Sequence, residues 1–291
     1  MDSISTEPGH INSGLAVRYE ASEASKTFGL WGQLHVGTFF TSHYIVPRTK
    51  LTIIIHRTKP SFHLMANTGA GEKYMVKILQ AKLKIRNLKV TESISLAHEQ
   101  ALGRSNACYS YNHSVIRKVP ITTNSVQFEV QDLFTDRVPD RIVVMFVKTR
   151  ALHGKYGLNP FNFEYFDLEN LKLTVNGNEV YNCYTEMDFS NKNYTEAFGE
   201  MHNQLGKSFK DGGLDINKKE YGAGYTFFPF DLTADGCSNS NKHLEANDLG
   251  NINISGNFKT RLSENITCIV YAEFENRLEI TKERNADVYN E

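Results

Sequence analysis

Apolar and polar residues alternate most regularly between Lys77 and Arg86. One face of an extended chain would carry four apolar side chains and the other four polar ones, namely Leu79, Ala81, Leu83 and Ile85 against Gln80, Lys82, Lys84 and Arg86. This period of two predicts a β-strand with one buried and one solvated face. After Asn87 the apolar positions move to Leu88 and Val90, which predicts a β-bulge at Asn87. The polar face is largely cationic, so it is either solvated or in contact with an acidic partner.

The stretch Tyr156–Tyr181 predicts a β-hairpin. Its apolar residues recur at alternate positions, first Phe161, Phe163 and Tyr165, then Leu171, Leu173 and Val175. Asn176-Gly177 follows, and this pair suits a type I′ turn because both central residues of that turn need positive φ. Glu179–Tyr181 is the expected return strand.

Other strands are expected wherever apolar residues alternate or run together: Trp31–Phe40, Leu51–Ile55, Val115–Ile121, Val126–Val130, Arg141–Lys148, Tyr225–Leu232, Asn251–Phe258 and Ile266–Phe274. Arg141–Lys148 has the continuous apolar run of a central, fully buried strand, whereas Pro229 places Tyr225–Leu232 at an edge or a bulge. Short helices are expected at Ser95–Leu102, ended by Gly103, and at Asn193–Leu205. Irregularly spaced strands with short inserted helices predict an all-β fold, an antiparallel β-sandwich of jelly-roll type.

Composition adds few constraints. The chain has 291 residues, 40% hydrophobic and 22% charged, with a net charge of -1, so nothing global draws it to nucleic acid or acidic membranes. A local basic surface is still compatible with this net charge. The four cysteines, Cys108, Cys183, Cys237 and Cys268, form no C-x-x-C pair. Free thiols are the default expectation, with two disulfides as the open alternative. The polar N-terminus lacks the apolar core of a signal peptide, and no run is long enough for a membrane span.

Catalytic templates fail on inspection. Gly206-Lys207-Ser208 lacks the first glycine of a P-loop, because Met201 stands at that position. His35 and His56 lie in predicted core strands without partners at metal-ligand spacing, which favours structural histidines. We therefore expect no enzyme, with no catalytic, cofactor-binding or metal-binding residues and no cofactor.

Seven segments, in order, resemble the capsid-type proteins of Polinton (Maverick) elements and the related adintoviruses. They are LWGQLHVGTFF (Leu30–Phe40), HRTKPSFHLM (His56–Met65), YMVKILQAKLKIRNLKV (Tyr74–Val90), LAHEQAL (Leu96–Leu102), NPFNFEYFDLENLKLTVNG (Asn159–Gly177), YGAGYTFFPFDLT (Tyr221–Thr233) and IVYAEFENRLEI (Ile269–Ile280). Each is a strand or turn sequence, and the specificity of the resemblance lies in the ordered set.

The resemblance implies a viral capsid protein of double jelly-roll type whose trimeric capsomers tile an icosahedral shell. It implies self-association, contacts with other capsid proteins, location in the virion and in the host cell, no membrane, and no specific binding of nucleic acid. The chain resembles only the second half of full-length members, so the first jelly roll expected before residue 25 is missing. The resemblance then implies a truncated fragment, an endogenised copy or one part of a split gene. The implied division is a polar arm or linker at 1–27, a jelly-roll capsid-type domain at 28–275 and a charged tail at 276–291. Asn253 and Gly256 are a second departure, since they weaken an expected strand.

The alternative is a cellular β-sandwich binding module for carbohydrate or protein, because jelly rolls also serve as lectins. In that case Tyr109, Tyr111 and Tyr156 would form an aromatic platform for a sugar. Packing at interfaces or under loops is the competing explanation for these three side chains.

Overall fold

The computed structural model describes residues 13–41, 43–66, 73–181, 183–208, 213–234, 236, 238 and 249–289. The chain forms two compact units. The first unit comprises Met1–Gly32, Thr58–Tyr74 and Ser114–Phe274, and the second comprises Gln33–Arg57, Met75–His113 and Glu275–Glu291. Each unit is described by itself below.

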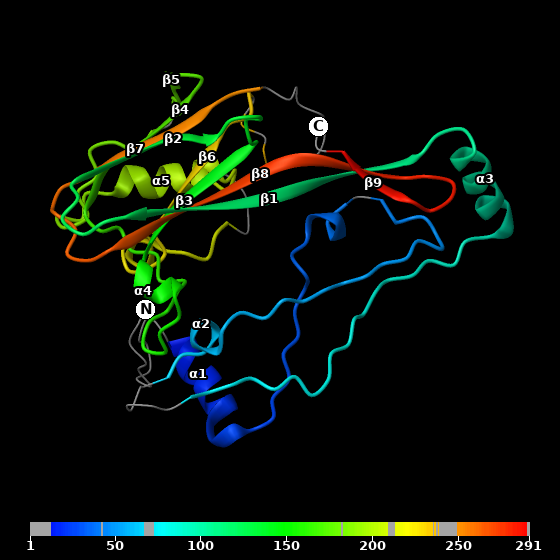
Figure 1. Ribbon diagram of the computed structural model, residues 1–291, viewed down its shortest axis with the longest axis horizontal. Helices are drawn as coiled ribbons and strands as arrows, with labels where there is room; N and C mark the ends of the chain where they lie inside the picture. Colours follow the sequence, from blue (N-terminus) through cyan, green and yellow to red (C-terminus); the bar gives the residue numbers. More distant parts are fainter. Residues whose placement is uncertain are drawn as a thin grey trace. The chain divides into compact units, whose positions relative to one another are not determined.

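The strands form two antiparallel sheets in jelly-roll order. One sheet has the order β1-β8-β3-β6, with β9 paired to β8, and the other has the order β2-β7-β4-β5. Successive strands along the chain alternate between the sheets, except for the neighbours β4 and β5 and the neighbours β8 and β9. This is the pattern of a jelly roll. The bounds are β1 Ala107–Ile121, β2 Gln127–Phe134, β3 Arg141–Lys148, β4 Leu168–Val175, β5 Asn178–Glu179, β6 Phe227–Asp231, β7 Ile252–Phe258, β8 Ile266–Ile280 and β9 Ala286–Tyr289 (Figure 1). The predicted fold class is confirmed.

Strand β3 holds the centre of the first sheet. It lies between β8 and β6, with Val144 opposite Val270 on one side and Phe228 on the other. Ile142, Val144 and Phe146 are fully buried, while the intervening residues are partly exposed. The prediction of a central strand is confirmed, but the prediction of full burial is wrong, because alternate residues of β3 are partly exposed. The prediction of an edge strand at Pro229 is confirmed, because β6 ends the sheet.

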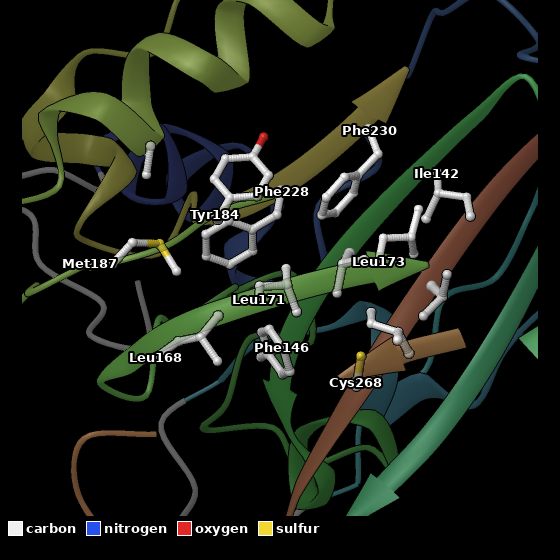
Figure 2. Packing of buried hydrophobic residues seen from close by; sticks show 14 of the residues in the cluster. Ile142, Phe146, Leu168, Leu171, Leu173, Tyr184, Met187, Phe228, Phe230 and Cys268 are labelled. Atoms are coloured by element: carbon white, nitrogen blue, oxygen red, sulfur yellow. The ribbon is translucent and has the colours of Figure 1, made fainter. Parts of the chain in front are cut away.

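The core lies between the sheets and is continuous across them. Figure 2 shows Leu171 and Leu173 of β4 facing Phe228 and Phe230 of β6, with Cys268 of β8 nearby. All five side chains have no exposed surface. Burial at roughly 1.5–3 kcal/mol per large apolar side chain makes this layer the main source of stability.

The predicted hairpin is present as β4 and β5. Asn176 has a φ of 52° and Gly177 a φ of 81°, as the expected type I′ turn requires. The return strand is shorter than predicted and covers Asn178–Glu179. The preceding aromatic alternation is not a strand, because Phe163 forms only an isolated bridge to Tyr225.

The two residues that weaken β7 in sequence have structural roles. Gly256 lies between β2 and β4, and a Cβ there would meet the Phe128 ring at 2.6 Å and the Asn170 carbonyl oxygen at 2.9 Å. The Asn253 side chain accepts a hydrogen bond from the backbone N–H of Asp132, at the irregularity in β2. The expectation of a weakened strand is therefore wrong, since β7 is the central partner of two strands.

Helices are short and lie in the connections. Their bounds are α1 Ser13–Ser22, η1 Glu23–Ser25, η2 Gly37–Phe39, α2 Pro60–His63, α3 Glu92–Leu102, α4 Thr149–Leu152, α5 Thr195–Gln204 and α6 Lys218–Tyr221. Helix α3 begins three residues before the prediction and ends, as predicted, at Gly103. Helix α5 is joined to β6 by Gln204, whose side-chain oxygen accepts from the Asp231 N–H at 2.8 Å.

Three predicted strands are absent. Trp31–Phe40 contains only η2, and Leu51–Ile55 and Lys77–Val90 have no regular secondary structure, so the bulge at Asn87 is absent too. A strand exists only when a neighbour accepts and donates its backbone hydrogen bonds. Alternation can show which face such a segment would bury, but it cannot supply that neighbour.

Helix α1 lies inside the predicted arm at 1–27, and β9 lies inside the predicted tail at 276–291. The division into arm, body and tail itself stays a prediction. Cys237 lies outside the described residues, whereas Cys183 and Cys268 are free thiols, as expected.

Candidate functional site

The segment of residues 77–90 in the second unit exposes an unusual surface. Its apolar side chains face solvent, with exposed fractions of 66% for Leu79, 52% for Leu83 and 71% for Ile85. In the described part of the chain, its backbone N–H and C=O groups make no hydrogen bond to another segment. The segment combines the side-chain pattern of a strand with the unsatisfied backbone of a sheet edge. These are the features to which another strand can add.

A second apolar stretch, Leu51–Ile55, belongs to the same unit and is exposed in the same way. Ile54 and Ile55 are 71% and 68% exposed. A run of aliphatic residues on a surface costs solvation free energy unless a partner covers it. The two stretches together make the second unit the candidate surface for association.

Tyr109 of β1 anchors the loop that leads into Leu51–Ile55. Its hydroxyl donates to the Tyr44 carbonyl oxygen at 3.2 Å and accepts from the Val46 N–H at 3.0 Å. The ring is only 4% exposed, and burial raises the pKa of the phenol above its usual value. One side chain thus fixes two backbone positions of the loop.

Arg284 forms a second anchor in this unit. Its guanidinium pairs with the carboxylate of Glu99 in α3 and donates through Nε to the Pro47 carbonyl oxygen at 2.9 Å. Arg284 itself is held in the turn between β8 and β9 by a bond from its backbone N–H to the Thr281 carbonyl oxygen. The turn, α3 and the loop are therefore joined at one guanidinium.

Gly37 closes the contact between its segment and β1. A Cβ at this position would lie 2.0 Å from the Asn112 carbonyl oxygen. Only glycine permits two backbones to approach this closely. The glycine that interrupts the predicted strand Trp31–Phe40 thus has a packing role.

Replacing Tyr109 with phenylalanine is expected to loosen the loop at residues 43–50. The change removes both hydrogen bonds of the hydroxyl and keeps the ring. The closed state of the loop therefore loses about 1 kcal/mol of stability, and the population with an open loop rises roughly fivefold. Trypsin cleavage after Arg48 and Lys50 in the full chain, followed by mass spectrometry, measures this. Tyr111→Phe is the matched control, because the Tyr111 hydroxyl has no hydrogen bond within the described structure. Equal cleavage rates for the two variants would contradict the anchoring role.

The first unit contains a cavity of about 470 Å³. Three loops line it, residues 162–167, 222–224 and 260–263. Backbone with positive φ shapes the first two loops, at Phe166, Asp167 and Gly224. The cavity was not predictable, since three loops remote in sequence meet there.

The carboxylates in this cavity are engaged by neighbouring side chains. Glu164 pairs with Lys148 at 2.9 Å and accepts from the Asn162 amide at 2.9 Å. Asp167 accepts from Ser190 at 2.7 Å and from Thr260 at 3.1 Å. These bonds hold the loops together, so we assign the carboxylates a structural role. Within the residues that the structure describes, no three His, Cys, Asp or Glu side chains gather as metal ligands do.

The aromatic platform expected for a sugar-binding module is not formed. Tyr109 is buried and Tyr111 packs near Gly37, both in the second unit. Tyr156 belongs to the first unit, where its hydroxyl and ring contact Tyr74. Packing under loops, the competing explanation, accounts for Tyr109.

The two histidines assigned to core strands are both exposed. His35 stacks on Phe40, with ring centroids 5.8 Å apart. The assignment is wrong because the strands that would have buried these histidines are absent. Sequence reasoning also missed Arg284, since nothing in a charged segment shows that one arginine reaches a loop more than two hundred residues away.

None of the helices in the described ranges combines the length and apolar character that crossing a bilayer requires.

Comparison with known proteins gives one distant relative and several viral structures. No family model matches the chain. The chain is 24% identical over 229 residues to Uncharacterized protein F54H12.2 of Caenorhabditis elegans, covering 77% of this chain and 54% of that protein. It therefore spans about half the length of this relative.

Several solved structures are similar at low sequence identity, and three of them illustrate the range. The PBCV-1 virus capsid gives a TM-score of 0.39 at 11% identity, over 67% of this chain and 54% of that chain. The mavirus major capsid protein gives 0.38 at 10% identity, over 64% and 41%. The Sputnik virophage structure gives 0.34 at 14% identity, over 64% and 39%. At these scores the likeness carries no argument about function, and the jelly-roll assignment rests on the strand order itself.

Proposed function

We propose that this chain is a capsid-type structural protein with no catalytic role. In this proposal it corresponds to the second jelly roll of a double jelly-roll major capsid protein of the Polinton, Maverick or adintovirus kind. It assembles with copies of itself into trimeric capsomers, contacts other capsid proteins, and is made inside the host cell for the virion.

The observation that carries the proposal is the order of the strands. Two sheets ordered β1-β8-β3-β6 and β2-β7-β4-β5 give the jelly roll that the ordered sequence resemblance implies. A jelly roll alone is used by unrelated proteins, so the fold narrows the function and does not fix it.

The exposed strand-like segment supports the assembly part of the proposal. Leu79, Leu83 and Ile85 are all more than half exposed. Covering such side chains between subunits is worth roughly 1.5–3 kcal/mol each, which is the usual driving force for obligate association. A neighbour that supplies a strand would also pair the backbone groups of residues 77–90.

Mass measured by light scattering across a concentration series, with negative-stain images of each peak, tests the proposal. We expect the mass to rise to trimers or larger closed assemblies. The variant Leu83→Ser with Ile85→Ser is expected to shift the midpoint of association by roughly 100-fold or more, since two buried side chains supply about 3 kcal/mol.

Lys82→Ser with Lys84→Ser is the matched control, because these residues alternate with the tested pair. We expect the control to associate like the unmodified chain. A monomer at every concentration would contradict assembly. Specific binding on a glycan array by that monomer would support a β-sandwich binding module instead.

A further inference from the structure

Charge is strongly segregated along this chain. Residues 26–90 carry eleven lysines and arginines against a single acidic residue, Glu72, which is a balance of +10. The whole chain has a net charge of -1, so the other residues together carry -11. The near-neutral net charge of the whole chain therefore conceals a strongly basic segment.

The cations between residues 77 and 89 of this segment are exposed and have no acidic partner in the described structure. Lys82, Lys84 and Arg86 face solvent, as do the neighbouring Lys77 and Lys89. Among the described residues, none of these five forms an ion pair. In the rest of the chain, by contrast, Arg141 pairs with Glu273. The positive charge between residues 77 and 89 is thus available to an external anion.

The spacing of these cations suits a row of phosphates. Residues 73–91 have no helix, turn or positive φ, and Figure 1 draws them as a long open trace. In an extended chain, alternate residues lie about 6.6 Å apart on the same face, which places Lys82, Lys84 and Arg86 in one row. Successive phosphates along a nucleic acid strand are separated by a similar distance.

The opposite face of the same segment distinguishes nucleic acid from an anionic membrane. Leu83 and Ile85 alternate with the cations, so in an extended chain they point away from them. A membrane would have to receive the apolar and the cationic side chains at one surface, whereas a phosphate backbone needs only the cationic row.

We propose that the exposed cationic row of residues 77–89 binds the phosphate backbone of nucleic acid without sequence preference. This inference does not rest on the proposed function, because it uses the cationic face and leaves the apolar face for subunit contacts. Binding by charge alone releases counterions, so it must weaken steeply with salt.

Fluorescence anisotropy of a short fluorescein-labelled DNA duplex of arbitrary sequence, titrated with the full chain, tests the proposal. We expect binding that weakens between about 50 and 200 mM salt, with equal affinity for a second unrelated sequence. Changing Lys82, Lys84 and Arg86 together to glutamine is expected to lower the affinity at least ~10-fold. It should also reduce the slope of log affinity against log salt by about 3, since each phosphate contact contributes about 1.

The control variant changes Lys118, Lys155 and Lys219 to glutamine. These residues are also exposed and lie outside the basic segment, so the net charge changes equally. We expect its slope to match that of the unmodified chain. Equal losses in the two variants, or no DNA binding by the unmodified chain, would overturn the proposal. So would binding to phosphatidylserine vesicles in place of DNA, which would assign the row to a membrane.

Discussion

Replacing Phe146 with alanine is expected to lower the free energy of unfolding by about 3–5 kcal/mol. Phe146 lies in β3 with no exposed surface. Its ring centroid is 5.7 Å from that of Phe128, 6.0 Å from that of Phe258 and 6.3 Å from that of Phe228. The first two come from the opposite sheet, so the ring joins both sheets, and its removal leaves a cavity that neither can fill.

Urea unfolding followed by far-UV circular dichroism measures this loss. Tyr181→Ala is the control, because Tyr181 is 98% exposed and its removal should change stability by no more than about 0.5 kcal/mol. A Phe146→Ala variant that unfolds within about 1 kcal/mol of the unmodified chain would contradict the central position of this ring.

The second large effect is expected at Gly256. Valine there would overlap both the Phe128 ring and the carbonyl oxygen of Asn170, which lie 2.6 and 2.9 Å from the position of a Cβ. Overpacking of this kind typically costs about 1–3 kcal/mol, and the backbone oxygen cannot rotate away, so we expect the upper end of that range. The same urea experiment gives the loss.

A double-mutant cycle separates the two causes of this loss. In a Phe128→Ala background, Gly256→Val should cost less, because the ring is gone and only the Asn170 oxygen remains. A coupling energy of about 1 kcal/mol between the two substitutions would show that the Phe128 ring excludes a larger side chain at position 256. Additive losses would show that the backbone contact alone demands glycine at this position.

Local sequence predicted the elements whose determinants are local. The turn at Asn176-Gly177 depends on two residues that tolerate positive φ, and β3 depends on a continuous apolar run. Both are present where predicted. The strand order then follows from pairings such as β1 with β8, which no local pattern encodes. The fold class was predictable from strand spacing, whereas the register was not.

The predicted strands that are absent share one physical cause. Lys77–Val90 and Leu51–Ile55 have the residue pattern of strands. A β-strand, however, needs a second segment that pairs with its backbone, and the described part of the chain offers them no such partner. The backbone contacts of Tyr109 and Arg284 were missed for the opposite reason. Each makes contacts to backbone atoms far away in sequence, and such contacts leave no periodic signal.

The position of β8 has a consequence for how the protein is made. This strand lies between β1 and β3, and only the short strand β9 is synthesised after it. At the usual rate of translation, β1 therefore waits on the order of ten seconds for its partner. During that interval an apolar sheet face is open to other nascent chains, and sheets closed by such distant pairs fold slowly. Production of this protein should thus depend on chaperones and on low synthesis rates as much as on the stability of the finished sandwich.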